Sequence, residues 1–264
     1  MENNIYISLR AISPNAEEFV RHCGADVLWK DSSDQSSSCI ITTRTDGLGI
    51  VFASIAPPCP EKARFILCKA LDDLCTEPDL TERCFNCRGN DQLSRDLAQI
   101  MGFKLEMAGY FLTRRNPPEQ VPKLSGLRAY QASDQDSWVE LSHLSYRKLC
   151  QVNGWNTQII HDPKVFGQDM LQRVTRNEAW SYLEQGKLIG GYRLNGSFIE
   201  DILVLPEHQN RGLGSQLLEY AVARVMQNGF AEVNLRVAES NTAALRLYQR
   251  RQFVLVSHFA EHCY

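Results

Sequence analysis

The sequence predicts a mixed α/β fold, built as two tandem domains of similar design. Residues 127–264 carry strand-like and helix-like patterns in the order β-α-α-β-β-β-α-β-α-β, which is typical of a mixed sheet covered by helices. The proline-rich stretch NPPEQVPK comes just before them, and residues 50–113 repeat part of the same order. We therefore expect one domain over 1–116, a linker over 117–126 and a second domain over 127–264.

The composition is that of an ordinary globular protein and excludes several classes of partner. The 264 residues are 44% hydrophobic and carry a formal net charge of −3. This charge gives no sign of a broad surface for nucleic acid or anionic lipid. No apolar run approaches the ~20 residues of a membrane span, and the N-terminus lacks the pattern of a signal peptide. We expect a cytoplasmic protein with no nucleic-acid or membrane partner.

Nine cysteines are scattered over both halves, an odd number that fits reduced thiols better than a disulfide framework. Cys84 and Cys87 form a CxxC pattern, and Cys68 and Cys75 precede it on an expected helix. A zinc site would need a second well-spaced pair. Small buried hydrophobes are the favoured interpretation, with zinc or redox chemistry as the alternatives. We expect no bound metal.

The second half divides into elements at clear turn signals. A helix is expected to start at Ser133 or Asp134, and Asn195-Gly196 is a strong hairpin signal. The expected strands are 127–132, 179–184, 187–194, 197–205, 231–237 and 252–260, and the expected helices are 133–150, 165–176, a segment after Gly212, and 239–251. In the first half, 30–38 is expected to be a surface loop.

The segment VLPEHQNRGLG, residues 204–214, places two glycines at the start of a strongly amphipathic helix. The first turn of a helix has unpaired N–H donors and a partial positive charge, which suits a phosphate group. Glycine lets the phosphate approach the backbone without a Cβ in the way, and Arg211 adds positive charge. The turn therefore predicts an anion site.

Two segments resemble the motifs of a known family. FIEDILVLPEHQNRGLGSQLLEYAV resembles motif A of the GNAT superfamily of N-acetyltransferases, Gln/Arg-x-x-Gly-x-Gly/Ala after an apolar strand. LRVAESNTAALRLYQRRQF resembles the second motif through Asn241, Ala244, Tyr248 and Phe253, although Gln252 stands where the family usually has glycine. The resemblance covers essentially all of the second half and implies the GNAT fold there.

The resemblance implies acetyl-CoA as cosubstrate. The end of the central strand would pair through its backbone with the pantetheine arm, the glycine turn would bind the pyrophosphate, and the second motif would follow the cofactor arm. The residues so implied are Ile202, Leu203, Val204, Gln209, Asn210, Arg211, Gly212, Leu213, Gly214, Ser215, Asn241, Ala244 and Tyr248. Asn241 has a second interpretation as a helix cap.

Acetyl transfer to an amine requires removal of an ammonium proton, stabilisation of the oxyanion, and protonation of the departing thiolate. Tyr248 is the expected acid, with a plain packing role as the alternative. Glu200 is the favoured base and Asp201 the second choice, and alternation along a strand would point them to opposite faces. A solvated strand carboxylate is the alternative. Some relatives place a glutamate where Arg236 stands here, so that route to a base is absent.

The first half resembles the second weakly. Asn90 falls where Asn241 falls, and Leu97 takes the place of Tyr248. PEKARF replaces the glycine turn, so we expect a degenerate GNAT-like domain without a cofactor site, or an unrelated α/β domain whose likeness is chance. The family adds a final strand after the one expected at 252–260. That strand is either absent here or supplied from elsewhere, for example by residues 5–10.

These observations lead to one favoured function. We expect an acetyl-CoA-dependent N-acetyltransferase that modifies a primary amine of a small molecule by direct attack in a ternary complex. The alternatives are a protein acetyltransferase that modifies a lysine or an N-terminus, and a non-catalytic acetyl-CoA-binding regulator. The sequence does not identify the acceptor amine, and a homodimer is one option for the assembly.

Overall fold

The computed structural model describes residues 3–31, 38–56 and 58–264, so most of the expected surface loop at 30–38 lies outside the described residues. The chain forms two compact units. One comprises Met1–Leu112, Val237–Glu239 and Leu255–Tyr264, and the other comprises Thr113–Arg236 and Ser240–Val254.

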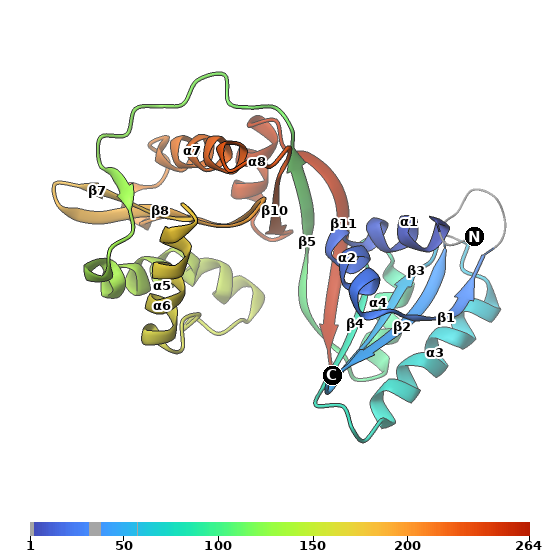
Figure 1. Cartoon of the computed structure of the whole chain (residues 1–264). Coiled ribbons are helices and arrows are strands. Elements are labelled where there is room, and N and C mark those ends of the chain that lie inside the picture. Colours follow the sequence, from blue (N-terminus) through green and yellow to red (C-terminus); the bar gives the residue numbers. More distant parts are fainter. Residues whose placement is uncertain (1–2, 32–37, 57) are drawn as a thin grey trace. The chain divides into compact units, whose positions relative to one another are not determined.

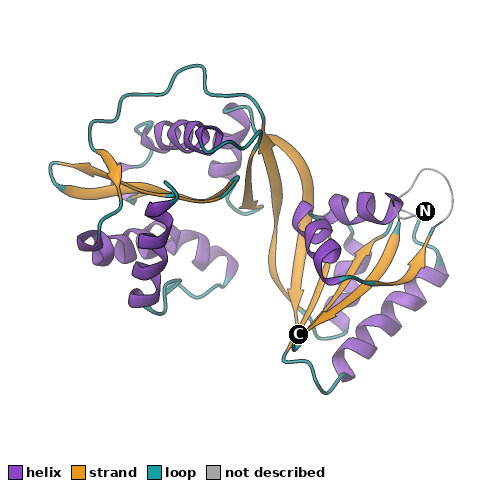
Figure 2. Ribbon diagram, viewed as in Figure 1, coloured by secondary structure: helices purple, strands orange, loops and turns teal. Residues whose placement is uncertain are grey.

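The first unit is a mixed sheet with helices on both faces (Figure 2). Its strands run in the order β1-β2-β3-β4-β11-β5. Helices α1 and α2 cover one face, around Leu9 and Phe52, while α3 and α4 cover the other, around Leu67 and Phe85. The elements are α1 (Asn3–Ile12), α2 (Pro14–Cys23), β1 (Asp26–Lys30), β2 (Cys39–Thr45), β3 (Leu48–Ser54), α3 (Glu61–Thr76), β4 (Glu82–Arg88), α4 (Gln92–Ile100), β5 (Lys104–Arg114) and β11 (Val254–Cys263).

The second unit has the same design, with strand order β10-β9-β8-β7-β6 (Figure 1). Two adjacent glycines of β8 mark its faces, because Gly191 lies against Trp138 of α5 and Gly190 lies against Leu217 of α7. The elements are β6 (Leu127–Ala129), η1 (Ala132–Asp134), α5 (Gln135–Asn153), α6 (Pro163–Thr175), β7 (Ala179–Glu184), β8 (Lys187–Asn195), β9 (Phe198–Val204), η2 (Pro206–His208), α7 (Leu213–Gln227), β10 (Val233–Ala238) and α8 (Thr242–Arg250).

The order α-α-β-β-β-α-β-α-β occurs twice, from α1 to β5 and from α5 to β11, so the chain contains a structural repeat. The residue correspondence expected within it is wrong by one position. Asp91 caps α4 by accepting from the Ser94 N–H, as Asn241 caps α8, so Asp91 rather than Asn90 is its counterpart. The counterpart of Tyr248 is then the buried Ala98, not Leu97, and it too carries no acidic proton.

The expected source of a final strand is also wrong, because residues 5–10 lie within helix α1. Ser8, Leu9 and Ile12 are buried at helical spacing, and Leu9 and Ile12 pack with the β2 and β3 core, which overrides the short alternation seen in the sequence. The strand after α8 is β11. It enters the first unit and pairs antiparallel with β4, with Phe259 opposite Arg88.

The CxxC cysteines lie on strand β4, where residues three apart point to opposite faces. Cys87 is buried in the core, and the Cys84 Sγ lies 3.5 Å from the Sγ of Cys263 on β11. Burial raises the pKa of Cys263 to about 12, so its thiol stays protonated at neutral pH. In the described part of the chain, no three His, Cys, Asp or Glu side chains are grouped to hold a metal ion.

Within residues 3–31, 38–56 and 58–264, no helix is both long enough and apolar enough to cross a bilayer.

A buried ion pair fixes the end of β5 to α7. The Arg114 Nη1 lies 3.0 Å from the Glu219 Oε1 and donates to the Arg251 carbonyl, and the Arg114 and Glu219 side chains are only 3% and 9% exposed. Glu219→Gln is expected to lower the free energy of unfolding by roughly 3–5 kcal/mol, because a buried guanidinium loses its counter-charge. Urea denaturation measures this. The control is Glu232→Gln, whose exposed pair with Arg115 should contribute less than about 1 kcal/mol. Equal effects would contradict the prediction.

A second prediction concerns acid stability. His262 is 3% exposed beside Phe85, and burial lowers its pKa below the usual 6.5. The unfolded chain therefore binds this proton more readily, so the folded state should lose stability as the pH falls from about 6.5 toward the lowered value. His262→Gln is expected to reduce the dependence of the free energy of unfolding on pH in this range. Denaturation curves recorded at several pH values between 8 and 5 measure it. An unchanged slope would rule out His262 as the titrating group.

Candidate functional site

The turn between β9 and α7 presents backbone donors at a helix start. Asn210 and Gly212 have positive φ values of 60° and 87°, and no side chain caps α7. The Gln216 N–H donates to the Gly212 carbonyl, which is the bond that closes the first turn of α7. The N–H groups of the turn before it have no intrahelical acceptors, as at every helix start. The turn therefore has the open backbone donors that an anion site requires.

The side chains around this turn leave room for a ligand. A Cβ placed on Gly214 would come no closer than 3.9 Å to Val204 and 4.0 Å to Leu247, so the fold itself does not require glycine there. The Ser215 Oγ is buried and has no hydrogen-bond partner among the residues that the structure describes. A bound phosphate would use both the free space and the unsatisfied hydroxyl, so the residues present fit the cofactor that the family motifs imply.

The equivalent turn of the first unit, before α3, differs in both its backbone donors and the free space around it. Helix α3 has Pro60, which carries no N–H, at its N-cap, and the acidic Glu61 in its first turn. A carboxylate beside the helix start disfavours a bound anion. The buried Ala63 packs into the core there. This turn offers fewer donors and the wrong charge for a pyrophosphate.

The pairing of the central strands also differs between the units. In the first unit, β3 and β4 pair in parallel over six residue pairs, from Leu48↔Glu82 to Ala53↔Cys87. In the second unit, β9 and β10 pair only at Asn234↔Phe198 and Leu235↔Ile199. The rest of β9, including Ile202 and Leu203, therefore has a backbone edge that β10 does not pair. An extended ligand could add to this edge as a strand does.

One backbone group of that edge is already occupied. The carbonyl of Val204 accepts hydrogen bonds from Gln209 Nε2 at 2.9 Å and from Ser145 Oγ at 3.1 Å. Gln209 therefore ties the turn to the end of β9. Since the Leu205 N–H donates to the Ile189 carbonyl of β8, alternation along the strand directs the N–H and carbonyl of Ile202, rather than those of Leu203, to the unpaired edge.

A β-bulge re-aims the two acidic residues of β9. Arg193 pairs with Asp201 and Leu194 pairs with Ile199, which leaves Glu200 as the extra residue. The expectation that Glu200 and Asp201 point to opposite faces is therefore wrong. Both carboxylates reach side chains on the α5/α6 side of the sheet, because the bulge interrupts the alternation of the strand.

Asp201 is buried and holds two partners. Its Oδ1 accepts from the Tyr146 hydroxyl at 2.5 Å, and its Oδ2 pairs with Arg193. Burial, followed by the nearby Asp201 charge, raises the pKa of Tyr146, so its hydroxyl remains a donor at neutral pH. The three side chains bring α5, β8 and β9 together.

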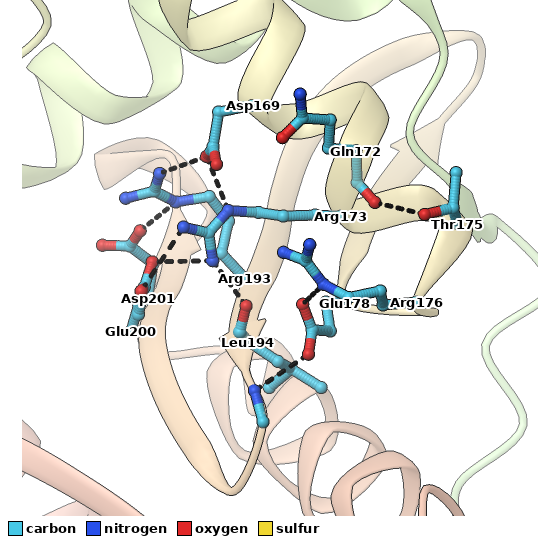
Figure 3. A network of polar contacts seen from close by, with 11 residues as sticks. Asp169, Gln172, Arg173, Thr175, Arg176, Glu178, Arg193, Leu194, Glu200 and Asp201 are labelled. Atoms are coloured by element: carbon cyan, nitrogen blue, oxygen red, sulfur yellow. Dashed lines mark hydrogen bonds and ion pairs between the residues drawn. The ribbon is translucent and has the colours of Figure 1, made fainter.

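Glu200 belongs to a neighbouring network, drawn in Figure 3. Its Oε2 lies 2.9 Å from the Nη1 of Arg173 on α6. Arg173 also donates to the Asp169 carboxylate at 2.5 Å and to the Leu194 carbonyl at 2.5 Å. Arg193 approaches the same aspartate at 3.9 Å. Glu200 therefore serves as the counter-charge of a largely buried arginine.

Tyr248 lies within electrostatic reach of Asp201. Burial, with the Asp201 charge as a second cause, raises the pKa of Tyr248 to about 12, so it is protonated at neutral pH. Its ring packs on Phe253, at 5.8 Å between centroids. Asn241 caps α8 by accepting from the Ala244 N–H at 3.2 Å, which is the cap interpretation of that residue.

Two cavities adjoin these groups. One of about 610 Å³ lies between α5, α6 and strands β8 and β9, and Tyr146 and Asp201 are in its lining. The other, of about 450 Å³, lies beside the start of α7 and the end of α8, and its lining includes Ser215, Gln216 and Arg251. Asp201 therefore borders the first cavity, and Ser215 borders the second.

Sequence reasoning missed Tyr146 and Arg193. A signal for Tyr146 was present, because Trp138, Ser142, Tyr146 and Cys150 follow each other at spacing four and form one inward face of α5. Arg193 could have been placed near the acidic pair from the hairpin at Asn195-Gly196. Arg193 pairs with Asp201 rather than Glu200 because of the bulge, and no residue pattern in this sequence predicts that bulge.

A mixed α/β unit with a splayed central strand pair and an open, glycine-bearing helix start has the architecture of a GNAT-like fold. Residues 138–253 match the acetyltransferase (GNAT) family. This match covers 116 of the 264 residues, from within α5 to the residue before β11.

Solved structures share the fold over most of the chain. A GCN5-related N-acetyltransferase from Sphaerobacter thermophilus matches 99% of this chain and 91% of that chain, with a TM-score of 0.60 and 16% identity. A GNAT-family acetyltransferase from Colwellia psychrerythraea matches 89% of this chain and 83% of that chain, with a TM-score of 0.54 and 9% identity. Both likenesses concern the fold alone.

A tandem GNAT protein from the clavulanic acid biosynthesis pathway matches 86% of this chain and 78% of that chain, with a TM-score of 0.48 and 16% identity. The repeat in this chain rests on its own order of elements. No curated protein sequence matches the chain.

Proposed function

We propose that this chain is an acetyl-CoA-dependent N-acetyltransferase that acetylates a primary amine of a small molecule by direct attack in a ternary complex. The observation that carries the proposal is the difference between the two units. The second unit has a splayed β9/β10 pair and an open turn at α7, and the first has a fully paired β3/β4 and a closed turn at α3.

The second unit supplies groups for each step. Backbone N–H groups from Asn210 to Ser215 would hold the pyrophosphate, because the Gln209 N–H already donates to the Pro206 carbonyl. The free edge of β9 at Ile202 would hold the pantetheine arm. A backbone N–H on β9 would stabilise the oxyanion. We propose this unit as the catalytic domain and the first as a domain without a cofactor site.

Asp201 is proposed as the group that drives loss of the amine proton. The hydroxyl of Tyr146 donates to this carboxylate, so its oxygen can accept a proton from the amine while its own proton moves toward Asp201. Tyr248 is protonated and would donate to the departing thiolate. Glu200, the base favoured by the sequence alone, has the Arg173 guanidinium as its partner and is the weaker candidate.

A small acceptor is favoured over a protein because the carboxylate lies within a cavity. The segment between α5 and α6 contributes Trp155 and Ile160 to its lining. Transfer to a protein lysine, or cofactor binding without catalysis, would be revealed by the same assays. Thermal stabilisation by acetyl-CoA tests cofactor binding, and thiol release with a panel of amines and peptides tests turnover. Binding without turnover on any acceptor would contradict the proposed catalysis.

The glycine turn gives a matched test of cofactor binding. Gly212 and Gly229, at opposite ends of α7, have φ values of 87° and 94°. A Cβ added at either position would have no other side-chain or backbone atom within 4 Å. Alanine at either position should strain the backbone by roughly 1–2 kcal/mol. Only Gly212→Ala is expected to weaken acetyl-CoA binding, by about tenfold or more, because only its Cβ faces the phosphate. Calorimetric titration measures this, and equal affinities would remove the turn from the site.

Gly214→Ala provides an independent check at the same turn. Alanine is the better helix former by roughly 0.5–1 kcal/mol, and the fold has room for its methyl group, so stability should be kept or raised. Because the motif accepts alanine at this position, the acetyl-CoA affinity should be retained, whereas Gly214→Leu, whose larger side chain would crowd the pyrophosphate, should lower it. A Gly214→Leu variant that binds acetyl-CoA as tightly as the unchanged chain would contradict the proposed site.

A further inference from the structure

The cavity beside Asp201 carries a net negative charge. Its lining contains three carboxylates, Asp162, Asp169 and Asp201, and one guanidinium, Arg193, and these four groups sum to a charge of −2. The adjoining pair of Arg173 with Glu200 is neutral and does not change this sum. A cation entering the cavity is attracted, and a ligand carboxylate or phosphate is repelled.

The acidic groups of the cavity lie at different depths. Asp201 is 6% exposed and binds Tyr146, whereas the Asp169 side chain is 38% exposed and pairs with Arg173. Asp162 caps α6 through one oxygen, accepting from the N–H groups of Lys164 and Val165. An ammonium group at Asp201 would thus lie at the inner end of the cavity, beyond the more exposed carboxylate of Asp169.

The remaining wall of the cavity is apolar. Trp155, Ile159, Ile160, Val165 and Phe166 line it, from the segment between α5 and α6 and from the first turns of α6. Ile159 and Val165 are 36% and 60% exposed, so apolar surface continues to the mouth. Aliphatic side chains offer no hydrogen-bond partners to the hydroxyl groups of a sugar, and buried unpaired polar groups are costly.

We infer that the acceptor is a primary amine on an uncharged apolar body, such as an arylalkylamine, with its ammonium group at Asp201 and its body against the wall of Ile159, Val165 and Phe166. This inference rests on the proposed function for the identity of the reacting end. Amino sugars and α-amino acids do not match the cavity, because they add polar groups or a negative charge along the apolar wall. Polyamines do not match either, because Asp169 already pairs with Arg173 and Asp162 already caps α6, so further ammonium groups would lie against apolar side chains.

Measurements of amine binding, which need no acetyl transfer, test this inference directly. Calorimetric titrations of the full chain, with and without saturating CoA, compare 2-phenylethylamine with L-phenylalanine, spermidine, glucosamine and a short peptide with a free N-terminus. 2-Phenylethylamine is expected to bind best. L-Phenylalanine has the same body with an added carboxylate, and it should bind at least about tenfold more weakly, because the carboxylate enters a negative cavity.

A matched pair of exposed valines identifies the binding site. Val165 lines the cavity mouth and is 60% exposed, whereas Val152, on α5 and outside the cavity lining, is 65% exposed. Val165→Lys is expected to lower the affinity for 2-phenylethylamine by about tenfold, through the added positive charge and the lost apolar contact. Val152→Lys should leave it unchanged. Both substitutions are at exposed helix positions, where lysine is tolerated.

The outcomes separate this inference from the proposed function. Failure of acetyl-CoA to bind would contradict the proposed function, while the amine titrations without CoA would still decide the acceptor class. The acceptor inference is overturned if no amine binds, if L-phenylalanine equals 2-phenylethylamine, or if spermidine, glucosamine or the peptide binds more tightly. It is equally overturned if the two lysine variants behave alike.

Discussion

Replacing Tyr248 with phenylalanine should reduce kcat by about 10²- to 10⁴-fold, the usual contribution of a positioned acid, with little change in the Kd of acetyl-CoA. The hydroxyl is protonated at neutral pH because burial and the Asp201 charge raise its pKa to about 12. The phenyl ring would keep its packing on Phe253, so the fold should be retained. Steady-state kinetics and cofactor titration measure the two quantities.

The control removes a buried hydroxyl elsewhere in the same unit. Tyr130 is 2% exposed, and its hydroxyl has no hydrogen-bond partner in the described part of the chain. Tyr130→Phe should therefore leave kcat unchanged. If Tyr248→Phe also retains full activity, the tyrosine is a packing residue and another group must protonate the thiolate.

The second large effect is expected from Asp201→Asn, which should lower kcat/KM by about 10²- to 10⁴-fold at neutral pH. Glu200→Gln is the matched comparison, one residue earlier on β9, and should cost much less because its carboxylate pairs with Arg173 rather than with Tyr146. Kinetics of the two variants with one amine decide between them. A larger loss in Glu200→Gln would return the base to the residue favoured by the sequence.

The pH profile separates proton transfer from a structural role of Asp201. An alkylammonium has a pKa of about 10.4, so free amine becomes more abundant as the pH rises. The loss of kcat/KM in Asp201→Asn, relative to the unchanged chain, should therefore become smaller as the pH is raised from 7 toward that value. A deficit that is constant with pH would indicate that the aspartate only supports the fold through Arg193.

The fold of the second half could be predicted well from the sequence because its signals are local. The strand expected at 179–184 and the hairpin at Asn195-Gly196 appear as expected, and the apolar stripe of Leu217, Ala221 and Val225 is buried in α7. The short segment at 5–10 could not be assigned in this way. Its alternation fits a strand, and only burial against the β2 and β3 core selects the helix.

The site was predictable where it depends on backbone geometry and less so where it depends on register. The turn at Gly212 and the cap at Asn241 follow from residue type, and the structure has both. The orientation of Glu200 and Asp201 could not be derived, because one inserted residue in a ladder reverses the alternation. Tyr146 comes from another element 55 residues away, so its contact with Asp201 is tertiary information.

The place of β11 has a consequence for biosynthesis. The sheet of the first unit takes β11 between β4 and β5, although this strand is encoded about 140 residues after β5. The first unit emerges first from the ribosome, yet its sheet has a gap until the last strand is translated, and such non-local pairing is slow. Fragments that separate the halves should therefore expose an unfilled strand position, and co-expression of the missing strand should restore solubility.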